Sequence, residues 1–151
     1  MLRISRRADY AIRVMIAAAQ TDAEEYLPAP RIGEQMLIPK PFLSKIIGDL
    51  KRGGLVTTAP GRRGGVSLAR PPEAITLRHI IEAVEGPMIL NDCLTEDGEC
   101  IPGVFCPAHP VWRHIQGVLH EQMDTCRLDM LARQMEGPHA QLPADDTTHG
   151  Q

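Results

Sequence analysis

The sequence RIGEQMLIPKPFLSKIIGDLKRGGLVTTAPGRRGGVSLAR at residues 31–70 carries the main structural signal. Residues 31–37 have helical spacing, residues 38–40 break it, and Pro41 suits the first turn of a second helix. Apolar residues then recur at i, i+3, i+4 and i+7, the spacing of a buried helical stripe: Leu43, Ile46, Ile47 and Leu50. Two short helices joined by a tight break predict a helix-turn-helix.

A short β-hairpin is expected directly after this pair of helices. Gly53 and Gly54 end the second helix, and residues 55–58 are prone to form a strand. The glycine-rich turn at 59–65 precedes a second short strand at 66–68 and carries Arg62 and Arg63. A helix-turn-helix followed by a basic hairpin is the winged-helix arrangement.

Helices are also predicted on both sides of this region. Residues 5–20 form one behind Ser5, a preferred N-cap residue, and residues 77–85 form another behind Thr76. From residue 110 to 136 we expect one long helix. Its apolar positions follow one seam: Ile115, Leu119, Met123, Cys126 and Met130.

The long helix favours a homodimer, because the chain has no second long helix to pair with this seam. Packing of the helix back onto its own domain is the alternative. Cys126 is expected to be a small buried side chain within the seam.

The expected fold is therefore mainly α with a small β-hairpin wing. A winged helix-turn-helix DNA-binding domain would span 1–87, a cysteine-rich loop 88–109 and a dimerisation helix 110–136. Residues 137–151 lack periodicity and are expected to be a disordered tail.

Composition excludes several classes of protein. The 151 residues include 43% hydrophobic and 23% charged residues, and no apolar run approaches the length of a membrane helix. Asp9 and Arg13 interrupt the apolar stretch near the N-terminus, so a secretion signal is not expected and we place the chain in the cytoplasm. Aromatic residues, at 3%, are too few for a single-strand stacking surface. No phosphate-binding glycine motif or nucleophile–base pattern points to an enzyme.

The net charge of −3 conceals a strong asymmetry. Residues 1–70 contain twelve lysines and arginines and six acidic residues, whereas residues 71–151 contain four and thirteen. The N-terminal part is thus +6 and the C-terminal part −9. This asymmetry predicts an anionic partner, double-stranded DNA, for the N-terminal part alone.

Candidate DNA-binding residues lie on the second helix and the hairpin. With its apolar stripe buried, the helix exposes Ser44 and Lys45 near the end that usually meets base edges in the major groove. Lys51 and Arg52 follow at positions suited to phosphates, and Arg62 and Arg63 suit a minor groove. Any one of these residues alone could be an ordinary surface residue. A dimer would bind a near-palindromic operator.

Three cysteines fall in the predicted loop: Cys93, Cys100 and Cys106, with His109 three residues after the last. Thiols stay reduced in the cytosol, and thiolates are soft metal ligands. Structural zinc usually takes more closely spaced ligands, so the spacing favours an iron–sulfur cluster with a non-cysteine fourth ligand. Zinc, or reactive thiols without metal, remain as alternatives.

These segments, in this order, resemble the IscR/NsrR family of iron–sulfur winged-helix transcription regulators. The resemblance spans residues 1 to about 135 and rests on several short stretches. They are LRIS with DYA near the start, LKRGGLV and GRRGG in the winged-helix part, IIEAVEG before the loop, the three cysteines, and CPAHPVW. The resemblance implies a homodimeric repressor or activator whose operator affinity depends on a bound cluster.

The family offers two fourth ligands. Members like the cluster-assembly regulator hold a 2Fe-2S cluster and use a histidine three residues after the last cysteine; the matching residue here is His109. Members like the nitric-oxide sensor hold a 4Fe-4S cluster and use an aspartate from the partner's first helix; the matching residue here is Asp9. We favour His109 and a 2Fe-2S cluster, because its spacing needs no partner chain. A cluster-free regulator that uses its cysteines as thiol sensors, or binds zinc, is the alternative function.

Overall fold

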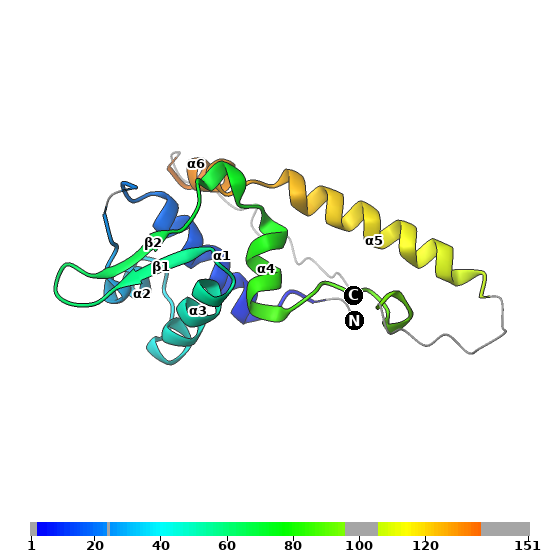
Figure 1. The fold of residues 1–151 in the computed structure, drawn as a ribbon, viewed down its shortest axis with the longest axis horizontal. Helices are drawn as coiled ribbons and strands as arrows, with labels where there is room; N and C mark the ends of the chain where they lie inside the picture. The colour runs from blue at the N-terminus through cyan, green and yellow to red at the C-terminus, as the bar shows by residue number, and fades with distance from the viewer. Residues whose placement is uncertain (1–2, 24, 96–105, 137–151) are drawn as a thin grey trace, which may run out of the picture.

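The computed structural model describes residues 3–23, 25–95 and 106–136, and its elements follow the predicted order (Figure 1). The winged-helix part contains α1 (Arg6–Ala19), α2 (Ala29–Gln35), α3 (Lys40–Arg52), β1 (Val56–Ala59) and β2 (Gly65–Leu68). A 3-10 turn η1 (Pro72–Ala74) leads into α4 (Leu77–Glu85), and a second 3-10 turn η2 (Asp92–Leu94) follows. The chain ends in α5 (Ala108–Thr125) and α6 (Leu128–Glu136). The predicted tail at 137–151 lies outside the described residues.

Helix α1 is the centre of the body because seven of its fourteen residues are buried. Ser5 caps it by accepting a hydrogen bond from the backbone N–H of Ala8. Helices α3, α4 and α6 pack around α1. Together they form one apolar core, whose fully buried side chains include Met15, Ile32, Ile46, Leu50 and Ile80.

The helix-turn-helix and its wing form as predicted. Leu43, Ile46 and Leu50 of α3 are buried, and Ile47 is half-buried against the same core. Strands β1 and β2 pair antiparallel, with Val56 opposite Leu68. Leu27 adds a single β-bridge to Val66 on the other side of β2, a contact that the sequence did not reveal.

The prediction of one continuous helix over 110–136 is wrong. Helix α5 ends at Thr125, since Cys126 has ψ 89°, and α6 begins at Leu128. Two backbone hydrogen bonds hold the break against the start of α4: Leu77 N–H donates to Cys126, and Leu128 N–H donates to Ile75. Leu128 is fully buried, so α6 returns to the body and packs on α1.

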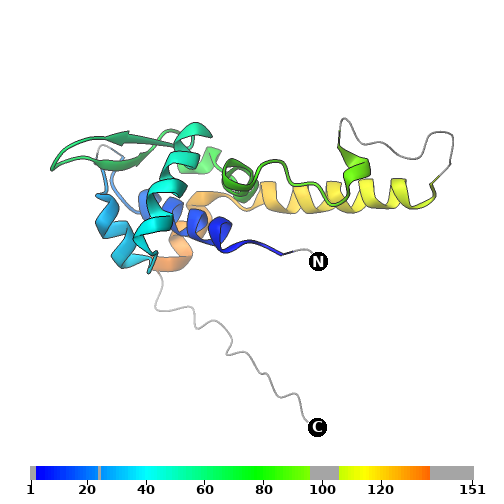
Figure 2. The ribbon, with the colours of Figure 1, turned by 90° about the horizontal axis from the view of Figure 1, so that it is seen from below.

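The wing and α5 project from opposite ends of the body (Figures 1 and 2). No helix among the described residues is long and apolar enough to cross a membrane. The described chain is therefore a helical body with two extensions, a basic hairpin and an amphipathic helix.

Candidate nucleic-acid interface and metal-binding segment

The exposed face of α3 carries the predicted DNA-binding residues. Pro39 precedes the helix and Pro41 lies in its first turn, where its missing N–H costs no hydrogen bond. Ser44, Lys45, Lys51 and Arg52 are all exposed. Gly48 lies between them on the same face. The exposed face of α3 therefore carries three cationic side chains around a glycine that has no side chain.

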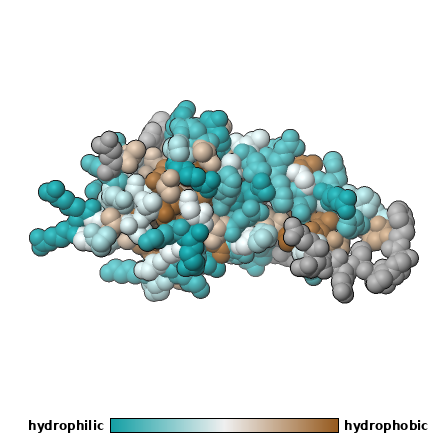
Figure 3. All heavy atoms as spheres, viewed as in Figure 1, coloured by the Kyte–Doolittle hydropathy of each residue, from teal (hydrophilic) through white to brown (hydrophobic). Residues whose placement is uncertain are grey.

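The wing presents Arg62 and Arg63 at its exposed tip. The tight turn depends on glycine at two positions. Gly61 has φ 93°, in the left-handed region, and a Cβ on Gly64 would lie 2.1 Å from the carbonyl oxygen of Ala59. Figure 3 shows that the projecting end of the wing is hydrophilic.

Two polar contacts around α3 were not predicted from the sequence. Lys51 Nζ donates to Thr58 Oγ1 of β1 at 2.9 Å. Asp49, which is only 3% exposed, accepts hydrogen bonds from both Arg52 and Arg7 of α1. An aspartate at a buried helix position predicts a cationic partner, but the sequence alone did not identify Arg7.

The described cysteines among the predicted cluster ligands lie at the two ends of the segment between α4 and α5. Cys93 is in η2 and Cys106 lies two residues before α5, and both are half-buried. Cys100 lies outside the described residues. His109 is in the first turn of α5, where its backbone N–H donates to Cys106 and its Nε2 lies 2.7 Å from Arg113.

The described donors do not meet in a single protomer. No group of three metal-binding side chains occurs among residues 3–23, 25–95 and 106–136. Asp9, the alternative ligand, is half-buried on α1 and pairs with Arg13 at 2.9 Å. The donor set itself, three thiols with an imidazole or a carboxylate, suits an iron–sulfur cluster.

Residues 87–90 connect α4 to the cysteine segment and are fixed to both helices. Glu82 of α4 accepts from the N–H of Met88, and His120 Nε2 of α5 lies 2.9 Å from the Met88 carbonyl oxygen. Gln116 of α5 accepts from the N–H of Leu90 at 3.0 Å. A shift of Cys93 would therefore move residues 87–90 and strain their hydrogen bonds to both helices.

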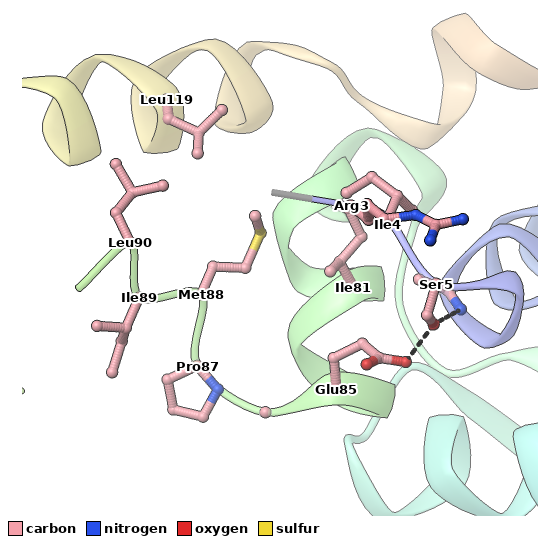
Figure 4. A pocket seen from close by; sticks show the side chains of 12 residues that line it. Arg3, Ile4, Ser5, Ile81, Glu85, Pro87, Met88, Ile89, Leu90 and Leu119 are labelled. Carbon is pink, nitrogen blue, oxygen red and sulfur yellow. Dashed lines mark hydrogen bonds between the residues drawn. The ribbon is translucent and has the colours of Figure 1, made fainter. Parts of the chain in front are cut away.

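A cavity of about 180 Å³ lies beside these residues (Figure 4). Its walls include Met88, Leu90 and Leu119, together with the start of α1. Across the cavity, Ser5 Oγ donates to Glu85 Oε1 at 2.6 Å and joins the α1 N-terminus to the end of α4.

Helix α5 has no buried residue in the single protomer. The predicted seam does not lie on one face of α5. Leu119 and Met123 are half-buried on the side of the body, whereas Ile115 is exposed. The exposed apolar residues form a different stripe: Val111, Trp112, Ile115 and Val118, between 40% and 55% exposed. Figure 3 shows apolar surface in the half of the molecule that contains α5.

Asp124 ties α5 to α4, and Asp129 forms local ion pairs at the start of α6. Arg78 of α4 donates to Asp124 of α5, and this hydrogen bond lowers the pKa of Asp124. Asp129 in α6 pairs with Arg127 and Arg133, and the hydrogen bond from Arg127 lowers the pKa of Asp129. All three ion pairs are stronger while the carboxylates are ionised.

The fold and the cationic faces of α3 and the wing define a winged-helix regulator. A family model described as Rrf2, iron-dependent transcriptional regulator, matches residues 4–134. The chain belongs to the Rrf2 family of transcriptional regulators.

Curated relatives and solved structures agree with this family. Protein aau3 of Rhizobium meliloti is 34% identical over 70% of this chain and 65% of its own length. The transcriptional regulator NsrR of Bacillus licheniformis is 31% identical over 70% of this chain and 74% of its own. The structure of CymR, the global cysteine regulator of B. subtilis, has a TM-score of 0.74 and 27% identity, covering 89% of this chain and 98% of that one. The structure of T. potens IscR has a TM-score of 0.70 and 28% identity over 93% of each chain. The family is one of transcriptional regulators, not enzymes, as the sequence indicated.

Proposed function

We propose that this regulator binds a near-palindromic DNA operator as a homodimer, and that an iron–sulfur cluster held by its cysteine segment controls operator affinity. The observation that carries the DNA part is the exposed α3 face. Ser44 and Lys45 would contact base edges, and Lys51 and Arg52 would contact phosphates. Arg62 and Arg63 of the wing would enter the flanking minor groove.

The second half of the interface comes from a second copy of the chain, joined through α5. An 18-residue helix with no buried residue and a continuous apolar stripe needs a partner surface. Two copies related by a twofold axis would present two equivalent α3 helices, one to each half of a palindromic site.

Sedimentation velocity tests the dimer. Ile115→Glu puts a charge in the stripe and should convert the dimer to monomer. Met130→Glu is the matched control, because Met130 is 47% exposed on α6, outside the stripe, compared with 43% for Ile115. The proposed interface fails if Ile115→Glu sediments as wild type does.

The cluster would be bound by Cys93, Cys100, Cys106 and His109, with Asp9 of the partner as the alternative fourth ligand. Ligation by His109 through Nε2 requires that nitrogen to leave Arg113, whereas ligation through Nδ1 does not. Ligation by Asp9 requires it to leave Arg13. When bound, the cluster supplies a redox-sensitive and nitric-oxide-sensitive group.

Residues 87–90 transmit the state of the cysteine segment in this proposal. Leu90 and Met88 are held against α5, and Met88 is also held by α4, so a movement of Cys93 on cluster binding would be passed to both helices. The angle between the dimer helix and each winged-helix body would then be set by the cluster. The two states must have different DNA affinities for control to result.

Native mass spectrometry of anaerobically purified protein tests the cluster and its ligands. The expected mass is two irons and two sulfides per chain, lost in Cys93→Ala and in His109→Ala. Four irons and four sulfides, lost in Asp9→Ala, would assign the alternative ligand and ligation across the dimer. A single zinc, or protein without metal, would contradict the cluster.

A thiol sensor without metal is the second candidate. It is favoured by the similarity to CymR, which is described as a global cysteine regulator and has also been solved in an oxidised form from Staphylococcus aureus. The DNA interface would be unchanged. Loss of free thiols after mild peroxide treatment, with a matching change in DNA affinity in protein lacking iron, would support it.

A further inference from the structure

A cluster of one carboxylate and two guanidinium groups lies at one edge of the α3 face. Asp49 of α3 is 3% exposed, and its two carboxylate oxygens accept from different arginines. Arg52 comes from the same helix and Arg7 from the first turn of α1. The three side chains together carry a net charge of +1, and the buried carboxylate holds both guanidinium groups in position.

Both arginines keep donors for another acceptor. A guanidinium has five N–H donors, and among the described residues each of these two has Asp49 as its one acceptor. Arg52 is 74% exposed and Arg7 34% exposed. The Nε of Arg7 is buried and has no partner in the described structure, so the donors that Arg7 can offer to a phosphate are those of its terminal nitrogens. Two adjacent guanidinium groups with free N–H donors match the bidentate geometry of a phosphate.

The position of Arg7 is unfavourable without an anion. The N-terminal end of a helix carries partial positive charge, yet Arg6 and Arg7 occupy the first turn of α1. Asp49 offsets one of these charges. Asp9, the one acidic residue of this turn, is paired with Arg13 instead.

The cluster also completes a symmetrical arrangement around α3. Lys51 lies at one edge of the exposed face, where it is fixed to Thr58 of the wing. Arg52 lies at the other edge, where Asp49 joins it to Arg7. A helix in the major groove, which is about 12 Å wide, has a phosphate backbone on each side.

We propose that Arg7 and Arg52 bind one DNA phosphate together and that Asp49 is the positioning residue that holds them. This rests on the proposed DNA-binding function and extends the interface to α1. It assigns a DNA contact to Arg7, which lies outside the helix-turn-helix and the wing. The contact is independent of sequence, because the ligand is a backbone phosphate.

The salt dependence of binding to a mixed-sequence duplex of about 30 base pairs tests the assignment. The logarithm of the association constant, measured by fluorescence anisotropy, falls linearly with the logarithm of the KCl concentration, by about 0.9 for each phosphate contact. Arg7→Gln should lower the magnitude of this slope by about 1 per protomer. Arg7→Lys, which keeps the charge, should retain most of the slope.

Arg133→Gln is the matched control. Arg133 forms the same kind of ion pair with a buried aspartate, but on α6, away from α3. Its slope should equal that of wild type. Asp49→Asn should bind the duplex less tightly although the local charge rises from +1 to +2, because both guanidinium groups lose the carboxylate that positions them. Tighter binding by a folded Asp49→Asn would show that charge alone acts here and that Asp49 does not position the arginines.

Labelling of wild-type protein with phenylglyoxal, read by peptide mass spectrometry, gives a test that needs no variant. The duplex should protect Arg7 and Arg52 and leave Arg133 reactive. A folded Arg7→Gln with the wild-type slope, or the absence of Arg7 protection, overturns the proposal. Failure of wild-type protein to bind any duplex would instead overturn the proposed function.

Discussion

The body and helix α5 bury apolar surface in opposite ways. Helix α1 buries half of its residues in the core, whereas the longer helix α5 buries none. The body is stabilised by its own packing. Helix α5 is held by a few polar contacts in its middle and C-terminal turns, through Gln116, His120 and Asp124, and exposes an apolar stripe. In the proposed dimer, a second copy of the chain would cover the stripe of α5, and the cysteine segment would set the position of this helix.

The largest contrast should come from truncating an apolar side chain in each region. Ile80→Ala removes a fully buried side chain of α4 and should lower the free energy of unfolding by about 3 kcal/mol. Val118→Ala, at 45% exposure on α5, should lower it by less than about 0.5 kcal/mol within the protomer. Urea unfolding followed by circular dichroism, at concentrations where the protein is monomeric, measures both. Equal effects would contradict the comparison.

A pair of glycine substitutions separates the tightly packed wing from the open face of α3. Gly64→Ala places a Cβ against the backbone of Ala59 and should destabilise the protein by about 2 kcal/mol. Gly48→Ala meets only the side chain of Arg52, at 3.7 Å, and should stabilise α3 by about 0.5–1 kcal/mol. Thermal unfolding should show melting temperatures that move in opposite directions.

Leu37 offers a smaller effect within the body. It lies in the turn between α2 and α3 with φ 54° and is 79% exposed. Leu37→Gly relieves the left-handed backbone strain and loses little burial, so stability should rise by about 1 kcal/mol or less. A lower melting temperature in this variant would show that the exposed leucine side chain is itself stabilising.

Acid should loosen the attachment of α5 to α4 more than the core. The folded-state pKa of Asp124 is lowered chiefly by the hydrogen bond from Arg78. Its contribution is therefore present above the ordinary aspartate pKa of about 3.9, and is lost as the pH falls through the lower folded value. Asp124→Asn should cost less than about 1 kcal/mol at pH 7, because the pair is partly exposed, and nothing at the acid limit. Urea unfolding of wild type and Asp124→Asn at pH 7 and at the acid limit measures this. A difference in unfolding free energy that is the same at both pH values would show that ionisation of Asp124 is not its cause.

Much of the body was predictable from sequence because its signals are local. The stripe of α3, the glycine-rich turn of the wing and the cap of α4 each lie within a few residues, and α4 spans the predicted 77–85. The exposed face of α3 was predictable from the helical spacing of its buried stripe, and the exposed tip of the wing from its glycine-rich turn.

The remainder depends on contacts distant in sequence. The break at Cys126 arises because Leu128 is buried and the neighbouring backbone pairs with α4, whereas helical periodicity continues through this point. The partner of Asp49 is 42 residues away, so spacing alone gave no indication of Arg7. Cys100 lies outside the described residues, and the predicted meeting of the three cysteines stays a prediction.

The central claim is that the state of the cysteine segment controls DNA affinity. The most direct measurement compares cluster-loaded and cluster-free wild-type protein on one operator duplex at one salt concentration, prepared without oxygen. The account predicts different dissociation constants, and a smaller difference in Gln116→Ala, which loses the contact of α5 with Leu90. Equal dissociation constants for the loaded and cluster-free protein would contradict it.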